Sequence, residues 1–198
     1  MQERRVVKTD SPDRPELEAA GWVVIARSWG ARLETDNRSI ERLAILIDRV
    51  NAIATIRELG PTDAGAVLAL DRETADDYPG DVATSHSALT PAQASPTIDH
   101  RGWGAFARDR RLVAMTFVES GSHGAETHFT VVHRGWRGRG LGTAVKAASV
   151  IALVDAGHRI FRTGGSMDNP ASIAANRAVG YELDEEWLTF AAGPQTAR

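Results

Sequence analysis

The chain has 198 residues, 42% of them hydrophobic and 25% charged, and its formal net charge at pH 7 is −3. This composition is typical of a soluble globular protein, and the length predicts one domain with an appended element. The slightly negative charge excludes a bulk attraction to nucleic acid or to an anionic membrane. The sequence has no cysteine, which excludes disulfides, thiolate zinc sites and a cysteine nucleophile. No apolar stretch has the length of a membrane span or the form of a signal peptide, so we expect a cytoplasmic protein.

The first fifty residues predict a helix, a strand and a second helix. Residues 15–22 are typical of a helix end, a glycine cap and the start of a strand, and residues 39–50 have the spacing of an amphipathic helix. The first of these units resembles the end of the chain, because in both a helix ends at glycine, an aromatic residue follows, and the strand carries a tryptophan (Trp29, Trp187). Residues 1–52 are therefore expected to be an extension. Chance similarity of two helix–strand units is the alternative explanation.

From residue 53, short apolar runs alternate with helical periodicity, which indicates an α/β or α+β layered fold. The pattern predicts a strand at 53–59, a turn at 60–63 and a helix towards Glu73. Residues 74–96 are rich in Pro, Ser, Thr, Asp and Gly, so we expect an irregular segment that shapes a substrate site. A hairpin is predicted at 102–107 and 112–118, followed by a strand at 126–132.

A glycine-rich segment, residues 137–142, separates that strand from a long predicted helix at 141–156, which stops at Gly157. A strand at 158–163, a helix at 170–179 and a strand at 181–190 complete the pattern. Strand, glycine loop and helix form an anion-binding arrangement, because backbone N–H groups at a helix start have no intrahelical partners and face outward. The segment lacks the lysine of a Walker loop. Its glycine spacing also differs from that of a dinucleotide-binding loop.

Arg137, Gly140 and Gly142 match Arg-x-x-Gly-x-Gly, the pyrophosphate-binding motif of the GNAT superfamily of acyl-CoA-dependent N-acetyltransferases. The element order over residues 53–191 also resembles the GNAT core, as does the segment from Asp168 to Tyr181, an Asn-led helix that ends in Gly-aromatic. The resemblance implies a mixed, mostly antiparallel sheet flanked by helices. It divides the chain into an N-terminal helix–strand–helix extension at 1–52, an acetyltransferase domain at 53–191 and a tail at 192–198. Descent from a preceding GNAT half is one interpretation of the extension.

The resemblance further implies that acetyl-CoA is the cosubstrate and that no metal takes part. Its pantetheine and thioester would be held by the backbone of the strand before the loop, at Thr130, Val131 and Val132. A backbone N–H directed at the thioester oxygen would stabilise developing negative charge. The cofactor-binding residues implied for the loop and the following helices are Arg137, Gly138, Arg139, Gly140, Leu141, Gly142, Thr143, Asn169 and Asn176.

Two residues are candidates for the general base that an attacking amine requires. Glu126 lies eleven positions before Arg137, the separation found in the histone acetyltransferase branch of the family, and we hypothesise that burial raises its pKa. His128 is the alternative, since its ordinary pKa of about 6.5 suits a base near neutral pH. Strand alternation would place Glu126, His128 and Thr130 on one face of the sheet.

The general acid is where the sequence departs from the family. Many members have a tyrosine seven residues after the helix-leading asparagine, and here that position is Asn176. An amide is not a proton donor of that kind, although it can donate a hydrogen bond to the sulfur. Asn169 is expected to cap its helix, and Tyr181 is expected to pack in the core.

The sequence thus predicts transfer of an acetyl group to a primary amine of an unknown small-molecule or peptide acceptor by direct attack in a ternary complex. A non-catalytic acyl-CoA-binding sensor or structural module is the alternative. Nucleic acid and membranes are not expected partners, whereas a homodimer is possible through the strand at 22–26. Acidic residues of the irregular segment (Asp76, Asp77, Asp81) are candidates for attracting a cationic amine, or else a solvated acidic loop.

Overall fold

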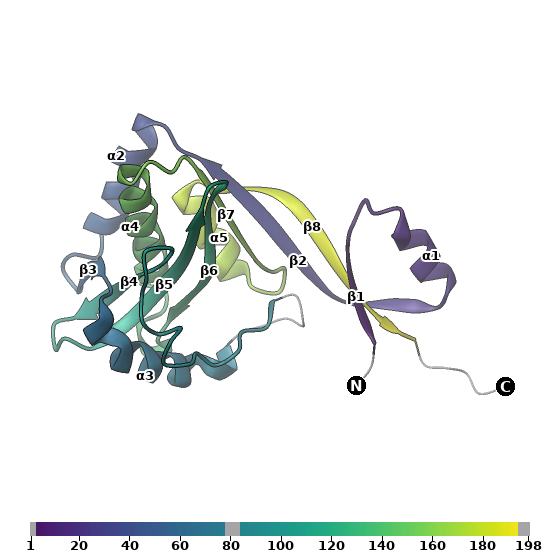
Figure 1. The fold of residues 1–198 in the computed structure, drawn as a ribbon, viewed down its shortest axis with the longest axis horizontal. Coiled ribbons are helices and arrows are strands. Elements are labelled where there is room, and N and C mark those ends of the chain that lie inside the picture. Colours follow the sequence, from purple (N-terminus) through teal and green to yellow (C-terminus); the bar gives the residue numbers. More distant parts are fainter. Residues whose placement is uncertain (1–2, 78–83, 194–198) are drawn as a thin grey trace.

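The computed structural model describes residues 3–77 and 84–193 (Figure 1). Within them, eight strands form one sheet in the order β1-β8-β2-β7-β6-β5-β4-β3. Neighbouring strands are antiparallel except for β6 and β7, which are parallel. The predicted mixed, mostly antiparallel sheet is therefore confirmed. The strands are β1 (Arg4–Lys8), β2 (Trp22–Glu34), β3 (Ala54–Glu58), β4 (His100–Ala107), β5 (Leu112–Gly121), β6 (Gly124–Val132), β7 (Ile160–Ser166) and β8 (Glu182–Ala192).

Helices cover both faces of the sheet. Side chains of α2, α4 and α5 pack with one face, and those of α3 pack on the other, against β5 and β6. In the described part of the chain, every helix is too short or too polar to cross a lipid bilayer. The α-helices are α1 (Asp13–Ala19), α2 (Asn37–Asp48), α3 (Ala64–Thr74), α4 (Leu141–Asp155) and α5 (Pro170–Val179), and short 3-10 turns are η1 (Pro61–Asp63), η2 (Ala75–Asp77) and η4 (Arg134–Trp136).

The helix boundaries follow from local chemistry. The Asp36 side chain accepts a hydrogen bond from the Ser39 backbone N–H, and the Ser39 hydroxyl accepts one from the Asp36 N–H, so a capping box starts α2. At the other ends of α4 and α5 the chain turns with positive φ at Gly157 and Gly180, where a side chain would be strained. The strands and helices predicted from residue 53 onward are confirmed, with shifts of a few residues at their ends.

The N-terminal extension is built into the sheet. β2 is longer than predicted, and it lies between β7 and β8, pairing with both. β1, which the sequence pattern did not predict, pairs with the outer part of β8. Trp29, Ala31 and Leu33 of β2 are buried in the same cluster as residues of α4 and α5. The extension therefore completes the core of the molecule from within the sheet.

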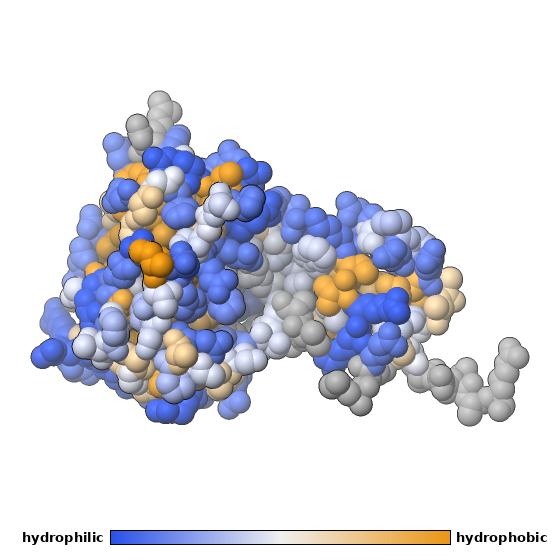
Figure 2. All heavy atoms as spheres, viewed as in Figure 1, coloured by the Kyte–Doolittle hydropathy of each residue, from blue (hydrophilic) through white to orange (hydrophobic). Residues whose placement is uncertain are grey.

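The outer halves of β2 and β8, together with β1 and α1, project from the main body as an arm (Figure 1). Leu17 of α1 packs against Leu188 and Phe190 and closes a small core there. Apolar side chains also gather on the surface of this arm, as Figure 2 shows. The large apolar residues exposed there are Val6, Val23, Val24 and Ile25.

Candidate functional site

The sheet opens between β6 and β7. The two strands pair only at Ala125 with Phe161 and at Glu126 with Arg162, and beyond these pairs they diverge. A cavity of about 790 Å³ occupies the gap. Its walls are residues 126–130 of β6, residues 162–166 of β7, Lys146 of α4, Asn169 and Ser172 at the start of α5, parts of β2 and β8, and residues from the segment after α3 (84–87, 89 and 93).

A β-bulge lies in the wall of this cavity. Phe117 and Val118 are adjacent on β5, but their partners on β6 are Phe129 and Thr127. His128 is therefore an extra residue on β6, and it reverses the alternation of side chains along the strand. Its ring lies 6.1 Å from that of Phe129.

The bulge corrects the prediction that Glu126, His128 and Thr130 share one face. Ala125 packs on the side of α4, so Glu126 points to the opposite side. Thr130 lies after the bulge and points to the α4 side, where its Cγ2 would be 3.9 Å from a Cβ at Gly142. All three predicted residues still line the cavity, because the gap between the strands opens to both faces.

The glycine loop has the backbone geometry of an anion site. Gly138 and Gly140 adopt positive φ values of 72° and 81°, which favour glycine. Gly140 is the N-cap of α4 and provides no side-chain cap, so N–H groups of the first turn are open to a ligand. Gly142 is closely packed as well, since a Cβ there would lie 3.2 Å from Cγ2 of Val132.

Arg137 is already paired with an acidic residue. Its Nε donates to the Val132 carbonyl at 3.1 Å, and its guanidinium forms an ion pair with Asp77, which also binds Arg134 at 3.1 Å. Two arginines therefore compensate the charge of Asp77 in this structure, and its role as an attractor of a cationic amine stays a prediction. Asp76 is exposed, and Asp81 lies outside the described residues.

The remaining loop and strand residues have varied surroundings. Leu141 is buried in the core and Thr143 is half-buried in the first turn of α4. The Arg139 guanidinium lies 5.1 Å from the ring centroid of Trp136. The Val131 side chain packs in the core beside α3, so any contact of this residue with a ligand would come from its backbone, on the side where β7 has diverged.

Both predicted bases, Glu126 and His128, line the cavity and both are exposed. The hypothesis that burial acts on Glu126 is therefore wrong, because the carboxylate stays in contact with solvent. The choice between the two as general base stays a prediction.

Asn169 caps α5 as predicted: its Oδ1 accepts a hydrogen bond from the Ser172 N–H at 3.0 Å, and the residue lines the cavity. Asn176 is buried, and its amide Nδ2 donates to the Ser172 carbonyl at 2.9 Å. It is not among the described residues that line the cavity. Its predicted contact with the cofactor stays a prediction. Tyr181 packs in the core as predicted, and burial raises its pKa to about 12.

Lys146 is the site residue that sequence reasoning missed. It is 4% exposed, its Nζ donates to Thr163 Oγ1 at 3.1 Å, and Nζ lies 5.5 Å from the ring centroid of Tyr181. Burial lowers the pKa of Lys146 to about 7. The sequence signal was a single lysine in the middle of a mostly apolar helix.

A second missed feature is a histidine–aspartate pair on the α3 side of the cavity. Asp71 is 2% exposed, its Oδ1 lies 2.7 Å from His86 Nε2, and its Oδ2 accepts the Leu89 N–H at 2.9 Å. The signal was an aspartate on the buried face of α3. Across residues 3–77 and 84–193, no cluster of three or more His, Asp or Glu side chains is arranged to hold a metal ion.

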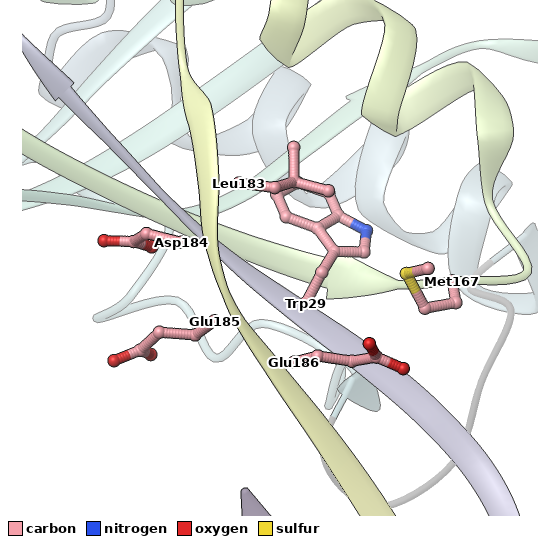
Figure 3. Close-up of a pocket in the computed structure, with 6 residues that line it drawn as sticks. All are labelled: Trp29, Met167, Leu183, Asp184, Glu185 and Glu186. Carbon is pink, nitrogen blue, oxygen red and sulfur yellow. The ribbon is translucent and has the colours of Figure 1, made fainter. Parts of the chain in front are cut away.

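A second hollow of about 270 Å³ lies beside Trp29 on β2 (Figure 3). Three successive acidic residues of β8 border it, and each is paired: Asp184 with Arg162 at 3.4 Å, Glu185 with Lys8 at 2.8 Å and Glu186 with Arg27 at 3.4 Å. These pairs compensate the acidic charge that would otherwise attract a cation, so we assign no ligand to this hollow.

No protein-family model matches the sequence, and no match was found among curated proteins. Solved structures do match. A tandem GNAT protein from the clavulanic acid biosynthesis pathway aligns with 97% of this chain and 64% of its own, at 22% identity and a TM-score of 0.65. A GCN5-related N-acetyltransferase from Sphaerobacter thermophilus aligns with 96% of this chain and 60% of its own, at 14% identity and a TM-score of 0.69.

This chain therefore spans less than two thirds of the length of those two proteins. The ribosomal-protein-S18-alanine N-acetyltransferase from Escherichia coli aligns over 99% of its own chain but only 74% of this one, at 15% identity and a TM-score of 0.54. The matches to the first two include nearly all of the present chain, the N-terminal extension among it. Over nearly its whole length, this chain has the fold of the GNAT N-acetyltransferases.

Proposed function

We propose that this protein transfers an acetyl group from acetyl-CoA to a primary amine of an acceptor. The observation that carries the proposal is the gap between β6 and β7, which opens a cavity of about 790 Å³. Thr130 lines this cavity and lies beside Gly142 in the uncapped first turn of α4. Such a site can bind a diphosphate at the N–H groups that start α4. It can bind a thioester along the part of β6 that is not paired with β7.

The residues present fit acyl-CoA. The first turn of α4 and Arg137 would hold the diphosphate, and the backbone of residues 130–132 would hold the pantetheine arm where β7 has moved away. When bound, acetyl-CoA supplies an acyl group activated as a thioester. Arg137 must first exchange Asp77 for phosphate, so the ion pair competes with the ligand.

The protein's own groups would then manage the protons of an amine acceptor. Glu126 or His128 would take the proton that the attacking amine loses, since both line the cavity and remain open to solvent. The acceptor itself, a small molecule or a peptide, would approach from the side of α3, where the segment at 84–93 borders the cavity.

The first test is binding of CoA, measured by isothermal titration calorimetry. We expect a Kd in the micromolar range that is typical of substrates. Arg137→Gln should weaken binding about tenfold, because it removes charge-assisted hydrogen bonds to phosphate. Asp77→Asn should strengthen it a few-fold, because the competing carboxylate is gone. An absence of CoA binding by the wild-type protein would overturn the proposal.

The second test separates an enzyme from a module that only binds acyl-CoA. Acetyl-CoA consumption is measured with a panel of amines, including polyamines, amino acids and peptide N-termini, against a reaction without acceptor. We expect at least one amine to raise the rate well above background, and Glu126→Gln or His128→Gln to reduce it. Binding without any amine-dependent turnover would support the non-catalytic module instead.

A further inference from the structure

We propose that Lys146 is the proton donor to the sulfur that leaves when the acyl group is transferred. This inference rests on the proposed function. It gives the reaction a general acid on the α4 side of the cavity, opposite Glu126 on the other side of the sheet. A donor other than residue 176 is needed, because Asn176 is an amide that is buried and bonded to Ser172.

The position of Lys146 on α4 supports this role. Gly142 packs against Thr130 and Val132, and Lys146 follows one helical turn later, so it projects from the same side of the helix. One turn advances about 5.4 Å along the axis. A ligand that begins at the glycine loop and follows the gap between β6 and β7 therefore meets Lys146 deeper in the cavity.

The surroundings of Nζ suit a proton donor. An ammonium group has three N–H donors, and among the described residues Thr163 is the one hydrogen-bond partner of Nζ, at 3.1 Å. Nζ therefore has N–H groups left for a ligand in the cavity that Lys146 lines. A charged group that is 4% exposed and binds no carboxylate within residues 3–77 and 84–193 is costly to keep for structure alone.

The proton transfer is balanced and favourable. As the bond between the acyl carbon and the sulfur breaks, its electron pair goes to the sulfur. Lys146 Nζ gives that sulfur one proton, becomes a neutral amine and regains a proton from solvent. The proton lost by the acceptor amine goes to Glu126 or His128. Burial lowers the pKa of Lys146 to about 7, below the value of about 8.5 of an alkyl thiol such as cysteine, so the transfer runs downhill.

The first test observes the lysine directly, without turnover. The chain has only two lysines, Lys8 and Lys146, so protein labelled with ¹³C-lysine gives two sets of side-chain NMR signals, which Lys8→Arg assigns. We expect Lys146 to titrate near pH 7. The Lys8 pKa is raised by its bond to Glu185, which makes Lys8 an internal control. Other titratable groups that face Lys146 or share its cavity are Tyr181, Arg162, Glu126, His128, His86 and Glu185.

The same NMR signals report contact with sulfur. CoA should raise the Lys146 midpoint relative to desulfo-CoA, which binds through the same diphosphate but lacks the sulfur. Identical midpoints with both ligands would overturn the proposal, as would a Lys146 that titrates near 10 in the free protein. If neither ligand binds, the proposed function fails and this inference fails with it.

The second test is kinetic. Lys146→Met keeps an unbranched side chain, one atom shorter, and removes the proton, so we expect kcat to fall about 10²-fold with little change in KM. The wild-type rate should decline as pH rises above about 7, and the variant should lose that decline. Lys8→Arg should leave kcat unchanged. Normal amine acetylation by Lys146→Met would overturn this inference and leave the proposed function standing. If that variant does not fold, the NMR comparison with the wild-type protein decides.

Discussion

Two βαβ units of this molecule have the same order and different consequences. One is β1-α1-β2 and the other is β7-α5-β8. In both, the helix ends before a glycine with positive φ, Gly21 or Gly180, and an aromatic residue follows. The strands of the two units alternate in the sheet, in the order β1-β8-β2-β7. Each second strand therefore pairs with the first strand of the other unit.

The units differ in what surrounds them. β7 contributes residues 162–166 to the cavity, because β6 diverges from it, whereas β1 is an edge strand that contributes only Val6. The alternating strands of the two units thus form one end of the sheet, whereas the cavity lies in the gap between β6 and β7. The descent of residues 1–52 from a preceding GNAT half stays a prediction.

The largest effect should come from removing the first unit. Without residues 1–34, β8 loses both of its neighbours and the core loses Trp29, Ala31 and Leu33. We expect the shortened chain to lose its cooperative thermal transition, measured by circular dichroism, because unpaired strand edges and an open core are both unfavourable. Removal of residues 1–10 alone takes only the edge strand and should leave a folded protein. A sharp transition at the original temperature without residues 1–34 would show that β2 is dispensable.

The two tryptophans should differ in their effect on stability. Trp187 pairs with Ser28, so Trp29 points to the opposite face of the sheet. Trp29 is 2% exposed and its Nε1 donates to the Ser166 carbonyl at 3.1 Å, whereas Trp187 is half-buried. Trp29→Ala should lower the free energy of unfolding by about 3–5 kcal/mol. The same change at Trp187 should cost clearly less. Equal losses of unfolding free energy for the two variants in urea denaturation would mean that both tryptophans contribute equally to stability.

Lys146, which contacts the second unit through Thr163, should make stability depend on pH. Burial lowers its folded pKa to about 7, so above that value the unfolded state binds more protons than the folded state. The free energy of unfolding should therefore rise between pH 7 and pH 9, by about 2 kcal/mol. Lys146→Met should be more stable at pH 7 and lack this rise.

The predicted rise in the free energy of unfolding is limited to pH 9, because burial raises the pKa of Tyr181 to about 12. An unfolded tyrosine ionises near pH 10, so above that pH the folded state binds more protons and stability falls again. A wild-type profile as flat as that of Lys146→Met, in urea titrations at several pH values, would contradict the burial of a titrating amine.

The sequence was enough to predict the elements from residue 53 onward, because apolar periodicity and glycine or asparagine caps are local signals. It did not reveal where β2 belongs. Its placement between β7 and β8 depends on pairing with segments more than 120 residues away, and no local pattern encodes such a partner. β1 was missed for a related reason, since RRVVK is short and polar and becomes a strand only beside β8.

The site was predictable where backbone chemistry defines it and less so where packing does. The glycine loop, Asn169 as a cap and the strand at 126–132 all follow from residue type and spacing. The bulge at His128 does not, because it depends on the register with β5. The burial of Lys146 and the pairing of Asp77 with Arg137 also needed the folded chain, since each joins residues from separate elements.

The smallest effect should come from the helix starts of the two units. Asn169 caps α5 through the Ser172 N–H. At the start of α1, Pro12 makes no side-chain cap, and Ser11 Oγ accepts a bond from the Asp13 N–H at 3.2 Å on an exposed surface. Asn169→Ala should lower the free energy of unfolding by about 1 kcal/mol, and Asn169→Asp, which can still cap, should retain most of it. Ser11→Ala should lower it by at most half as much, because a weak bond on the surface is replaced by water. Equal losses for the two alanine variants in denaturant titrations would show that α1 depends on its first turn as much as α5 does.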